Sequence, residues 1–403
     1  MSMMSFRTFS VALLAAVLLA FGAIGLFNRI VDPFWYFRDI EIDGFNRHKP
    51  RAASFDRAIK PALVVKLAPQ AVIVGSSVAA VGLPPTHPGF TQRGRLTPYN
   101  LGLARAAWDE VFCLAVFAMN NAPVQRLVVG ISGIEELDLP VCPSERERGR
   151  IDYASLLFST TAFAASRETL RGQDRGPSTT REGLWYLARY DPNIRTDDDV
   201  TRRFALQMRE ALCAGAGAGA APFDAAMIDR TPPSARQGAG LRRLIRLARQ
   251  QNVELKLLVY PKHVLLEEAE RACRGAGDHW TRLWQLVSIV HQEDRAPGAK
   301  VEVWAFYGYH PLNGERIRAG KPMRDRLWQD GGHFNEEIGA AVFDAMYSGK
   351  HGFGAMVTAQ NFDQRVTEVE AQRRAFRSNN GWLDEELAEI ARKLPDLPPP
   401  VAR

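Results

Sequence analysis

The chain has 403 residues, of which 46% are hydrophobic and 24% are charged, and it carries a formal net charge of +6. This length and apolar content exclude a disordered protein and suffice for one large domain with insertions or for two domains. Basic residues are spread along the whole chain without a dense block or a basic-aromatic ladder, so the sequence predicts no nucleic-acid partner.

Residues 8–27 carry no charge and have the length that an α-helix needs to cross a bilayer. The run is longer than the apolar core of a usual signal peptide and no A-x-A cleavage site follows it. We therefore predict a single-pass anchor in the lipid bilayer. Arg7 precedes the run and Arg29 and Arg38 follow it, which favours a cytoplasmic domain, but large domains translocate largely regardless of such charges.

Residues 28–69 are expected to form a membrane-proximal linker after the short N-terminal segment 1–7 and the anchor. From residue 70 onward, short apolar runs alternate with stretches of helical pattern. The apolar runs are residues 71–75, 126–132, 254–261 and 301–308, and the helical stretches are residues 108–121, 241–252, 264–274 and 335–346. This alternation predicts an α/β domain over residues 70–350 with a parallel sheet covered on both faces.

Two parts of the chain depart from that alternation. Between about residues 140 and 235 we expect a mostly helical insertion over one end of the sheet, which includes the low-complexity stretch ALCAGAGAGAAPFD. Residues 351–403 are polar and end in a proline-rich segment, which predicts an extended C-terminal tail.

The four cysteines, Cys113, Cys142, Cys213 and Cys273, have neither C-x-x-C nor Cys/His ligand spacing. A structural zinc site is therefore not expected, and the histidines of the chain make no recognisable metal set. A disulfide can form if the domain lies in an oxidising compartment, but the sequence does not pair the cysteines.

Ligands of open parallel sheets bind beyond the carboxyl ends of the strands, and the first predicted strand ends in Gly75-Ser76-Ser77. One interpretation is a strand-to-helix turn in which a serine caps the next helix. The other is a nucleophile whose hydroxyl lies above the sheet, near helix N–H groups. The second interpretation requires a base elsewhere in the chain.

Asp330 and His333 provide a candidate base in the glycine-rich stretch WQDGGHFN. A carboxylate three residues before an imidazole can fold back onto its Nδ1–H, fix the tautomer and leave Nε2 free to accept a hydroxyl proton. The alternative is a solvated loop with an incidental histidine. The order Ser, Asp, His also occurs in α/β-hydrolases, but there the acid and the histidine are far apart in sequence.

These motifs resemble the blocks of the SGNH (GDSL-like) hydrolase superfamily. Gly75–Ser77 matches the first block, with Ser77 in the place of the nucleophile. Gly102, in YNLGLARAAWDEV, matches the glycine whose N–H serves the oxyanion hole, and Asp330 and His333 match the D-x-x-H block. The envelope-associated branch is most similar, namely the D-alanyl-transfer protein of teichoic acid operons and the alginate O-acetylation proteins.

The resemblance implies a three-layer α/β/α sandwich and an acyl esterase or O-acyltransferase that acts on an envelope or exported polysaccharide. Ser77 would attack the ester, His333 would relay the proton and Asp330 would orient His333, without a cofactor or a metal. The resemblance also implies an inner-membrane protein with its domain in the periplasm or outside the cell.

One block departs from the family pattern. The asparagine that usually completes the oxyanion hole is absent after the strand that ends near Gly130, where Ser132 is the candidate donor beside the N–H groups of Ser77 and Gly102. Losing one donor costs roughly 100- to 1000-fold in rate. The rival hypothesis is therefore a non-catalytic SGNH-like protein that binds polysaccharide or serves its assembly; a lipid esterase or thioesterase would need a more apolar lid.

Substrate contacts are expected from residues that follow the later strands. Lys262 and His263 come after the run 254–261, and either could supply the missing donor, although His263 could instead cap the next helix or pack beneath the loop. Tyr307 follows the last strand, where an aromatic wall for a sugar ring is expected together with Trp304, Tyr309 and His310, although core packing explains Trp304 equally well.

Overall fold

The fold is taken from a computed structural model, which describes residues 6–131, 142, 149–174, 177–186, 196–209, 223–234, 238–294, 298–318, 320–349 and 352–393. The chain divides into two compact units. The first consists of Met1–Lys66 and Arg146–Thr180, and the second of Leu67–Glu145 and Arg181–Arg403.

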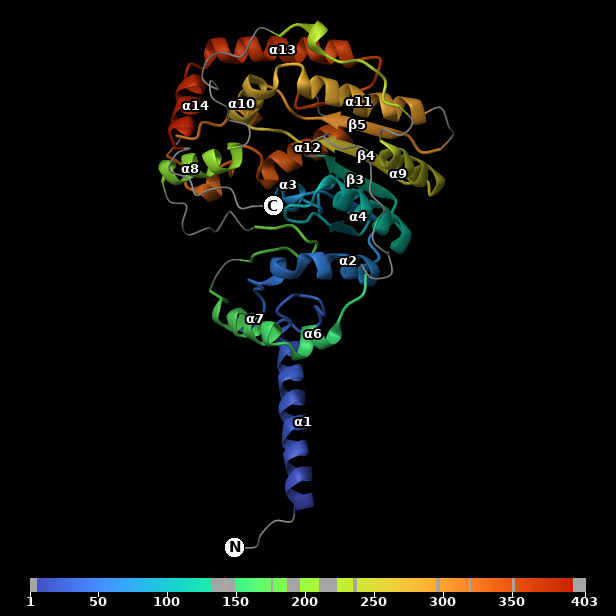
Figure 1. The fold of residues 1–403 in the computed structure, drawn as a ribbon, viewed down its shortest axis with the longest axis vertical. Coiled ribbons are helices and arrows are strands. Elements are labelled where there is room, and N and C mark those ends of the chain that lie inside the picture. The colour runs from blue at the N-terminus through green and yellow to red at the C-terminus, as the bar shows by residue number, and fades with distance from the viewer. Residues whose placement is uncertain are drawn as a thin grey trace. The chain divides into compact units, whose positions relative to one another are not determined.

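The first unit is built around helix α1 (Phe6–Val31), which is long and apolar enough to span a membrane. Figure 1 shows α6 (Tyr153–Phe158) and α7 (Thr160–Arg171) against its C-terminal turns. Asn28 of α1 is buried, donates to the Leu157 carbonyl at 2.7 Å and accepts from Ser166 Oγ at 2.8 Å. The last turns of α1 are thus part of a folded unit.

The region predicted as a membrane-proximal linker, residues 28–69, is mostly folded into this first unit. It contains the 3-10 helix η1 (Ala52–Phe55) and helix α2 (Asp56–Leu67). Ile59, Leu63 and Val64 lie on the buried side of α2, where the spacing of four and five residues places them on one face. The prediction of a linker is therefore wrong for residues 28–66.

The described residues of the second unit form one six-stranded sheet, mostly parallel, as the alternating pattern predicted. Across the sheet the strands are β2 (Pro98–Asn100), β1 (Ala71–Val74), β3 (Arg126–Ile131), β4 (Glu254–Val259), β5 (Val301–Ala305) and β6 (Ala355–Met356). Only β6 runs antiparallel to its neighbour. The four predicted strands are confirmed, whereas β2 and β6 are too short to give a sequence pattern.

Helices cover the sheet, and α4, α9 and α11 contact its strands (Figure 1). Their bounds are Trp108–Asn121, Ala239–Gln250 and Asp278–Glu293. Helix α12 (Glu336–Ser348) contacts the short helix α3 (Ser77–Gly82), and α10 (Val264–Arg274) contacts α14 (Trp382–Lys393). The four predicted helical stretches are confirmed, and α11 is an additional helix.

Most of the predicted C-terminal tail is helical, while its proline-rich end, residues 394–403, lies outside the described residues. Residues 362–393 form α13 (Phe362–Asn379) and α14 (Trp382–Lys393), and α14 packs on α8 (Asp197–Met208). Each helix buries apolar residues at helical spacing, namely Phe362, Val366, Val369, Leu383, Leu387 and Ile390. Burial of these two faces explains why the region folds despite its polar composition.

The predicted insertion is divided between the units. Its first part, Arg146–Thr180, belongs to the first unit, whereas α8 and the 3-10 helix η2 (Ala225–Met227) belong to the second. Cys113 of α4 forms a disulfide with Cys142, with their Cα atoms 5.4 Å apart. Cys273 is disulfide-bonded as well, so the cysteines serve the fold as crosslinks.

Candidate active site

The turn after β1 gives its two serines different roles. Ser76 is the N-cap of α3 and its Oγ accepts from the Val78 N–H at 3.4 Å, whereas Ser77 is the first helical residue. The N–H groups in the first turn of a helix have no partner within that helix. Ser76 is therefore the helix cap of the first interpretation, and Ser77 has the position that the second interpretation gives to the nucleophile.

The fold brings Ser77 to His333, which lies 256 residues later in the chain and three residues after Asp330. Ser77 Oγ lies 2.8 Å from His333 Nε2. The other ring nitrogen, Nδ1, lies 2.9 Å and 2.8 Å from the two carboxylate oxygens of Asp330. Because a carboxylate only accepts, Nδ1 carries the proton and Nε2 is left to accept one from the serine.

Asp330 is fixed by more than the imidazole. Its Oδ1 also accepts from the backbone N–H groups of Gly332 at 2.9 Å and His333 at 2.8 Å. Burial alone would raise the pKa of Asp330, but the electrostatic interaction with the His333 ring and these hydrogen bonds outweigh it and hold the pKa below its usual value. The carboxylate is therefore ionised at neutral pH.

Arg203 is a residue of the site that the sequence did not indicate. It lies in α8, more than a hundred residues before Asp330 in the chain. Its Nε is 3.8 Å from Asp330 Oδ2. A guanidinium at this distance favours the ionised carboxylate. Its pattern in the sequence is that of an ordinary surface arginine on a helix, so only the fold reveals the contact.

Gly102 lies beside α3 as the resemblance implies, but its N–H is engaged. It donates to Asn100 Oδ1 at 2.9 Å, and the fully buried Asn100 in turn donates to the carbonyls of Ala79 at 2.8 Å and Leu83 at 3.0 Å. A Cβ at position 102 would lie 2.6 Å from the backbone nitrogen of Ala80, so this position requires glycine.

The oxyanion hole therefore stays a prediction. The Gly102 N–H would have to exchange Asn100 for a substrate oxygen. Ser132, the third candidate donor, lies outside the residues that the structure describes.

His263 is buried and lies next to the loop that carries Asp330 and His333. It is fully buried, its Nδ1 accepts from the Leu265 N–H at 3.2 Å as the cap of α10, and its Nε2 is 2.6 Å from the Glu315 carbonyl. The backbone N–H of His263 donates to the Gly331 carbonyl at 3.0 Å. Burial lowers the pKa of His263 to about 4. Of the two roles left open for His263, substrate contact or capping and packing, the structure favours capping and packing beneath the loop.

The other expected substrate contacts are also engaged elsewhere. Lys262 donates to Glu270 at 2.5 Å. Tyr307 is buried and packs edge-on against Trp280, and Tyr309 is buried as well. The structure therefore does not place Tyr307 in an aromatic wall open to a sugar ring.

Tyr260 is a further residue of the site that the sequence did not single out. Its buried hydroxyl occupies the space above two glycines, because a Cβ added to Gly75 or to Gly130 would overlap it. Gly75 directly precedes the serine turn, so the ring of Tyr260 packs beneath that turn. The signal in the sequence was a glycine inside the apolar run 126–132, which marks close approach of another group.

Gly130→Ala is expected to destabilise the protein by about 2 kcal/mol, because overpacking of an interior costs about 1–3 kcal/mol. Tyr260→Phe removes the oxygen, but the ring carbons Cζ and Cε1 would still lie 2.2 Å and 2.7 Å from the added Cβ, so the double variant should recover only part of that loss. Denaturant unfolding of the parent, the two single variants and the double variant, followed by tryptophan fluorescence, measures these free-energy differences. A Gly130→Ala chain as stable as its parent would contradict the close packing.

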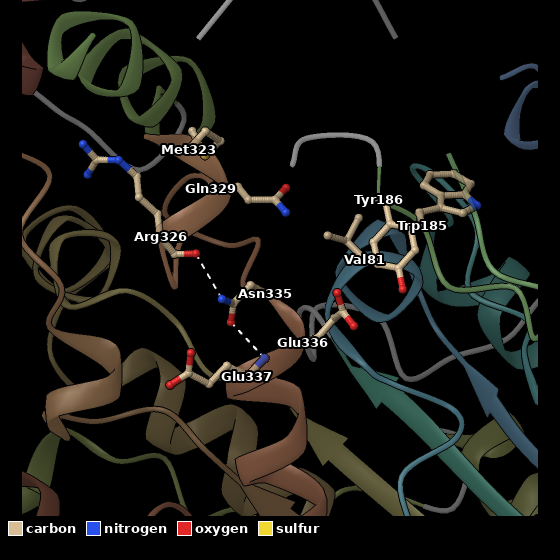
Figure 2. Close-up of a pocket in the computed structure, with 9 residues that line it drawn as sticks. All are labelled: Val81, Trp185, Tyr186, Met323, Arg326, Gln329, Asn335, Glu336 and Glu337. Atoms are coloured by element: carbon tan, nitrogen blue, oxygen red, sulfur yellow. Dashed lines mark hydrogen bonds between the residues drawn. The ribbon is translucent and has the colours of Figure 1, made fainter. Parts of the chain in front are cut away.

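A cavity of about 310 Å³ lies beside the loop that carries Asp330 and His333 (Figure 2). It is lined by Val81, Trp185, Tyr186, Met323, Arg326, Gln329, Asn335, Glu336 and Glu337. Gln329 directly precedes Asp330, and Val81 belongs to the helix that begins with Ser77. Within the described part of the chain, no group of three or more His, Cys, Asp or Glu side chains is arranged to hold a metal.

Comparison of the chain with protein-family models, with curated proteins and with solved structures finds no match.

Proposed function

We propose that the protein is a membrane-anchored, SGNH-like acyl esterase or O-acyltransferase that acts on ester groups of an envelope or exported polysaccharide. The observation that carries the proposal is the chain of hydrogen bonds from Ser77 Oγ through His333 to Asp330. A serine, an imidazole and a buried carboxylate in this geometry are the parts of a catalytic triad. The SGNH-like sandwich and the polysaccharide substrate come from the sequence resemblance.

In the proposed reaction, Ser77 Oγ bonds to the ester carbonyl carbon while its proton passes to His333 Nε2. The tetrahedral intermediate then breaks its bond to the sugar oxygen, and that oxygen takes the proton from His333. Water or an acceptor hydroxyl attacks the acyl-enzyme in the same way, with His333 as the base. The Ser77 N–H, in the first turn of α3, would donate to the oxyanion.

The proposal places α1 in the inner membrane and the catalytic unit outside the cytoplasm. Helix α1 is long and apolar enough to cross the bilayer. The Cys113–Cys142 disulfide fits an oxidising compartment, because disulfides form and persist there.

A fluorophosphonate probe tests the proposal on the full-length chain in detergent. We expect one adduct, on Ser77, located by mass spectrometry. Ser76→Ala is the matched control, because it removes the adjacent serine and its cap and should keep the labelling, whereas Ser77→Ala should abolish it. An unlabelled parent chain with a native circular dichroism spectrum, or an adduct on Ser76, would contradict the enzymatic function.

The second candidate is a non-catalytic protein that binds polysaccharide or serves its assembly. The engagement of the Gly102 N–H by Asn100 favours it, because a catalytic oxyanion hole needs donors aimed at the substrate oxygen. A folded chain that fails to react with the probe is the result expected of this candidate.

A further inference from the structure

Two short helices of the first unit pack on the apolar part of α1. Figure 1 shows that α6 and α7 run across α1, not along it, and both contact it. The Phe158 ring, at the end of α6, lies beside Gly25, where an added Cβ would be 2.5 Å from its Cε1 atom. The same ring contacts Phe21, at 6.3 Å between ring centroids, and Phe163 of α7 contacts Phe27 at 5.7 Å.

The position of these contacts along α1 gives the depth of α6 in a bilayer. As a helix, the charge-free run 8–27 is about 30 Å long, which equals the thickness of the hydrocarbon core. Phe27 then lies at the boundary of that core, and Gly25 and Phe21 lie about 3 Å and 9 Å inside it. Because the Phe158 ring contacts both, it lies level with the lipid chains. Helices that lie in the membrane interface insert their apolar face to a similar depth, about 5–10 Å.

The phenylalanines of α6 and α7 are open to the surroundings of the protein. Phe158 is 44% exposed and Phe163 is 39% exposed, although phenylalanine usually lies in the interior. Phe21 of α1, which contacts Phe158, is 54% exposed. The exposed apolar surface of α1 therefore continues onto α6, and the lipid that surrounds Phe21 also meets Phe158.

Side chains typical of the membrane–water interface lie at the other end of α6. Tyr153 is exposed, and its hydroxyl lies 3.3 Å from that of Tyr36. Its ring lies 6.4 Å from the ring of Phe37, over which the Arg29 guanidinium lies at 4.1 Å. Arg29 comes directly after the apolar part of α1, so it marks the level of the headgroups. Tyrosine is enriched at this level, and arginine extends its charged end toward it.

We infer that α6 and the first turn of α7 are embedded in the bilayer surface at the C-terminal end of α1. Phe158 and Phe163 lie among the upper parts of the acyl chains, and Tyr153 lies at the headgroups. The partner of this surface is the lipid bilayer, because the surface continues the lipid-facing side of α1. The inference rests on the membrane span of α1 in the proposed function. The first unit is then held at the bilayer by α6 and α7 as well as by α1.

Depth-dependent fluorescence quenching tests this placement in the full-length chain, reconstituted in phosphatidylcholine vesicles. Phe158→Cys and Phe163→Cys are labelled singly with the environment-sensitive fluorophore NBD. The quencher is a phosphatidylcholine with a nitroxide near the top of one acyl chain. Every cysteine that the structure describes is in a disulfide, and the parent chain, treated in the same way, gives the background labelling.

Leu19→Cys, at an exposed position of α1, is the positive control for a lipid-facing label. Glu168→Cys is the matched negative control: Glu168 is exposed, lies about 140° around α7 from Phe163 and pairs with Arg51 at 3.1 Å. We expect quenching at positions 158 and 163 to lie within twofold of that at position 19. Quenching at position 168 should be at least fivefold weaker than at position 163.

Quenching at position 19 without quenching at positions 158 and 163 would overturn the inference and leave the span of α1 in place. The emission of NBD then identifies what meets the two side chains. Emission at long wavelength means water, and emission at short wavelength means that a protein partner or a second copy of the chain covers them. Phe158→Cys loses the ring that packs beside Gly25, so position 163 decides the test if that variant does not fold.

The same measurement separates this inference from the rest of the proposed function. Absence of quenching at position 19 would contradict the membrane anchor and the placement of α6 together. Neither result bears on Ser77, whose reaction with the fluorophosphonate probe tests catalysis independently.

Discussion

Asp330→Asn is expected to lower the rate of acylation of Ser77 by about 10⁴-fold, with the fold intact. The carboxylate accepts from His333 Nδ1 and from two backbone N–H groups. An asparagine has one accepting oxygen, and its NH₂ group facing Nδ1 would hold the proton on Nε2. The imidazole could then no longer accept the proton of Ser77.

The measurement is the second-order rate constant of fluorophosphonate labelling, together with hydrolysis of p-nitrophenyl acetate. Asp325→Asn is the matched control, since it makes the same change at an exposed position five residues earlier and should keep the parent rate. A loss of less than tenfold in Asp330→Asn would show that His333 does not depend on this carboxylate.

Asn100→Leu is expected to cost about 4 kcal/mol of unfolding free energy. The substitution removes the acceptor Asn100 Oδ1 from the Gly102 N–H and the donor Asn100 Nδ2 from the carbonyls of Ala79 and Leu83. Each buried polar group that loses its partner costs about 1–3 kcal/mol. The loss should also loosen the contact between β2 and α3, and so slow the labelling of Ser77.

Denaturant unfolding of the full-length chain in detergent measures this cost. Asn121→Leu makes the same substitution at an exposed position at the end of α4 and should change the unfolding free energy by no more than about 0.5 kcal/mol. If Asn100→Leu were as stable as Asn121→Leu, the network around Gly102 would have no part in holding the serine turn.

The core of the site could be predicted because its signals are local. A buried apolar run followed by Gly-Ser-Ser marks a strand end, and the spacing of Asp330 and His333 lets one side chain fold onto the other. The sheet then places both at one edge, because β1, β3, β4 and β5 run parallel and in register.

The residues around that core depend on packing between distant segments. No local sequence pattern predicts that Asn100 contacts Gly102 or that Arg203 contacts Asp330. His263 comes directly after a strand, which is also where a substrate-binding residue is expected. Only its burial in the structure shows that it caps a helix and does not contact a ligand. The C-terminal helices did have a sequence signal, the spacing of Phe362, Val366 and Val369, which the polar composition obscured.

The buried end of α1 affects how the protein can be shortened for experiments. Gly25, Asn28 and Val31 are buried in the first unit, whereas the preceding turns of the helix are exposed. A chain that starts after Val31 would leave the Leu157 carbonyl and the Ser166 hydroxyl without the side chain that they bind. A soluble version of the protein should therefore begin within the helix, before Gly25, with its exposed apolar positions made polar.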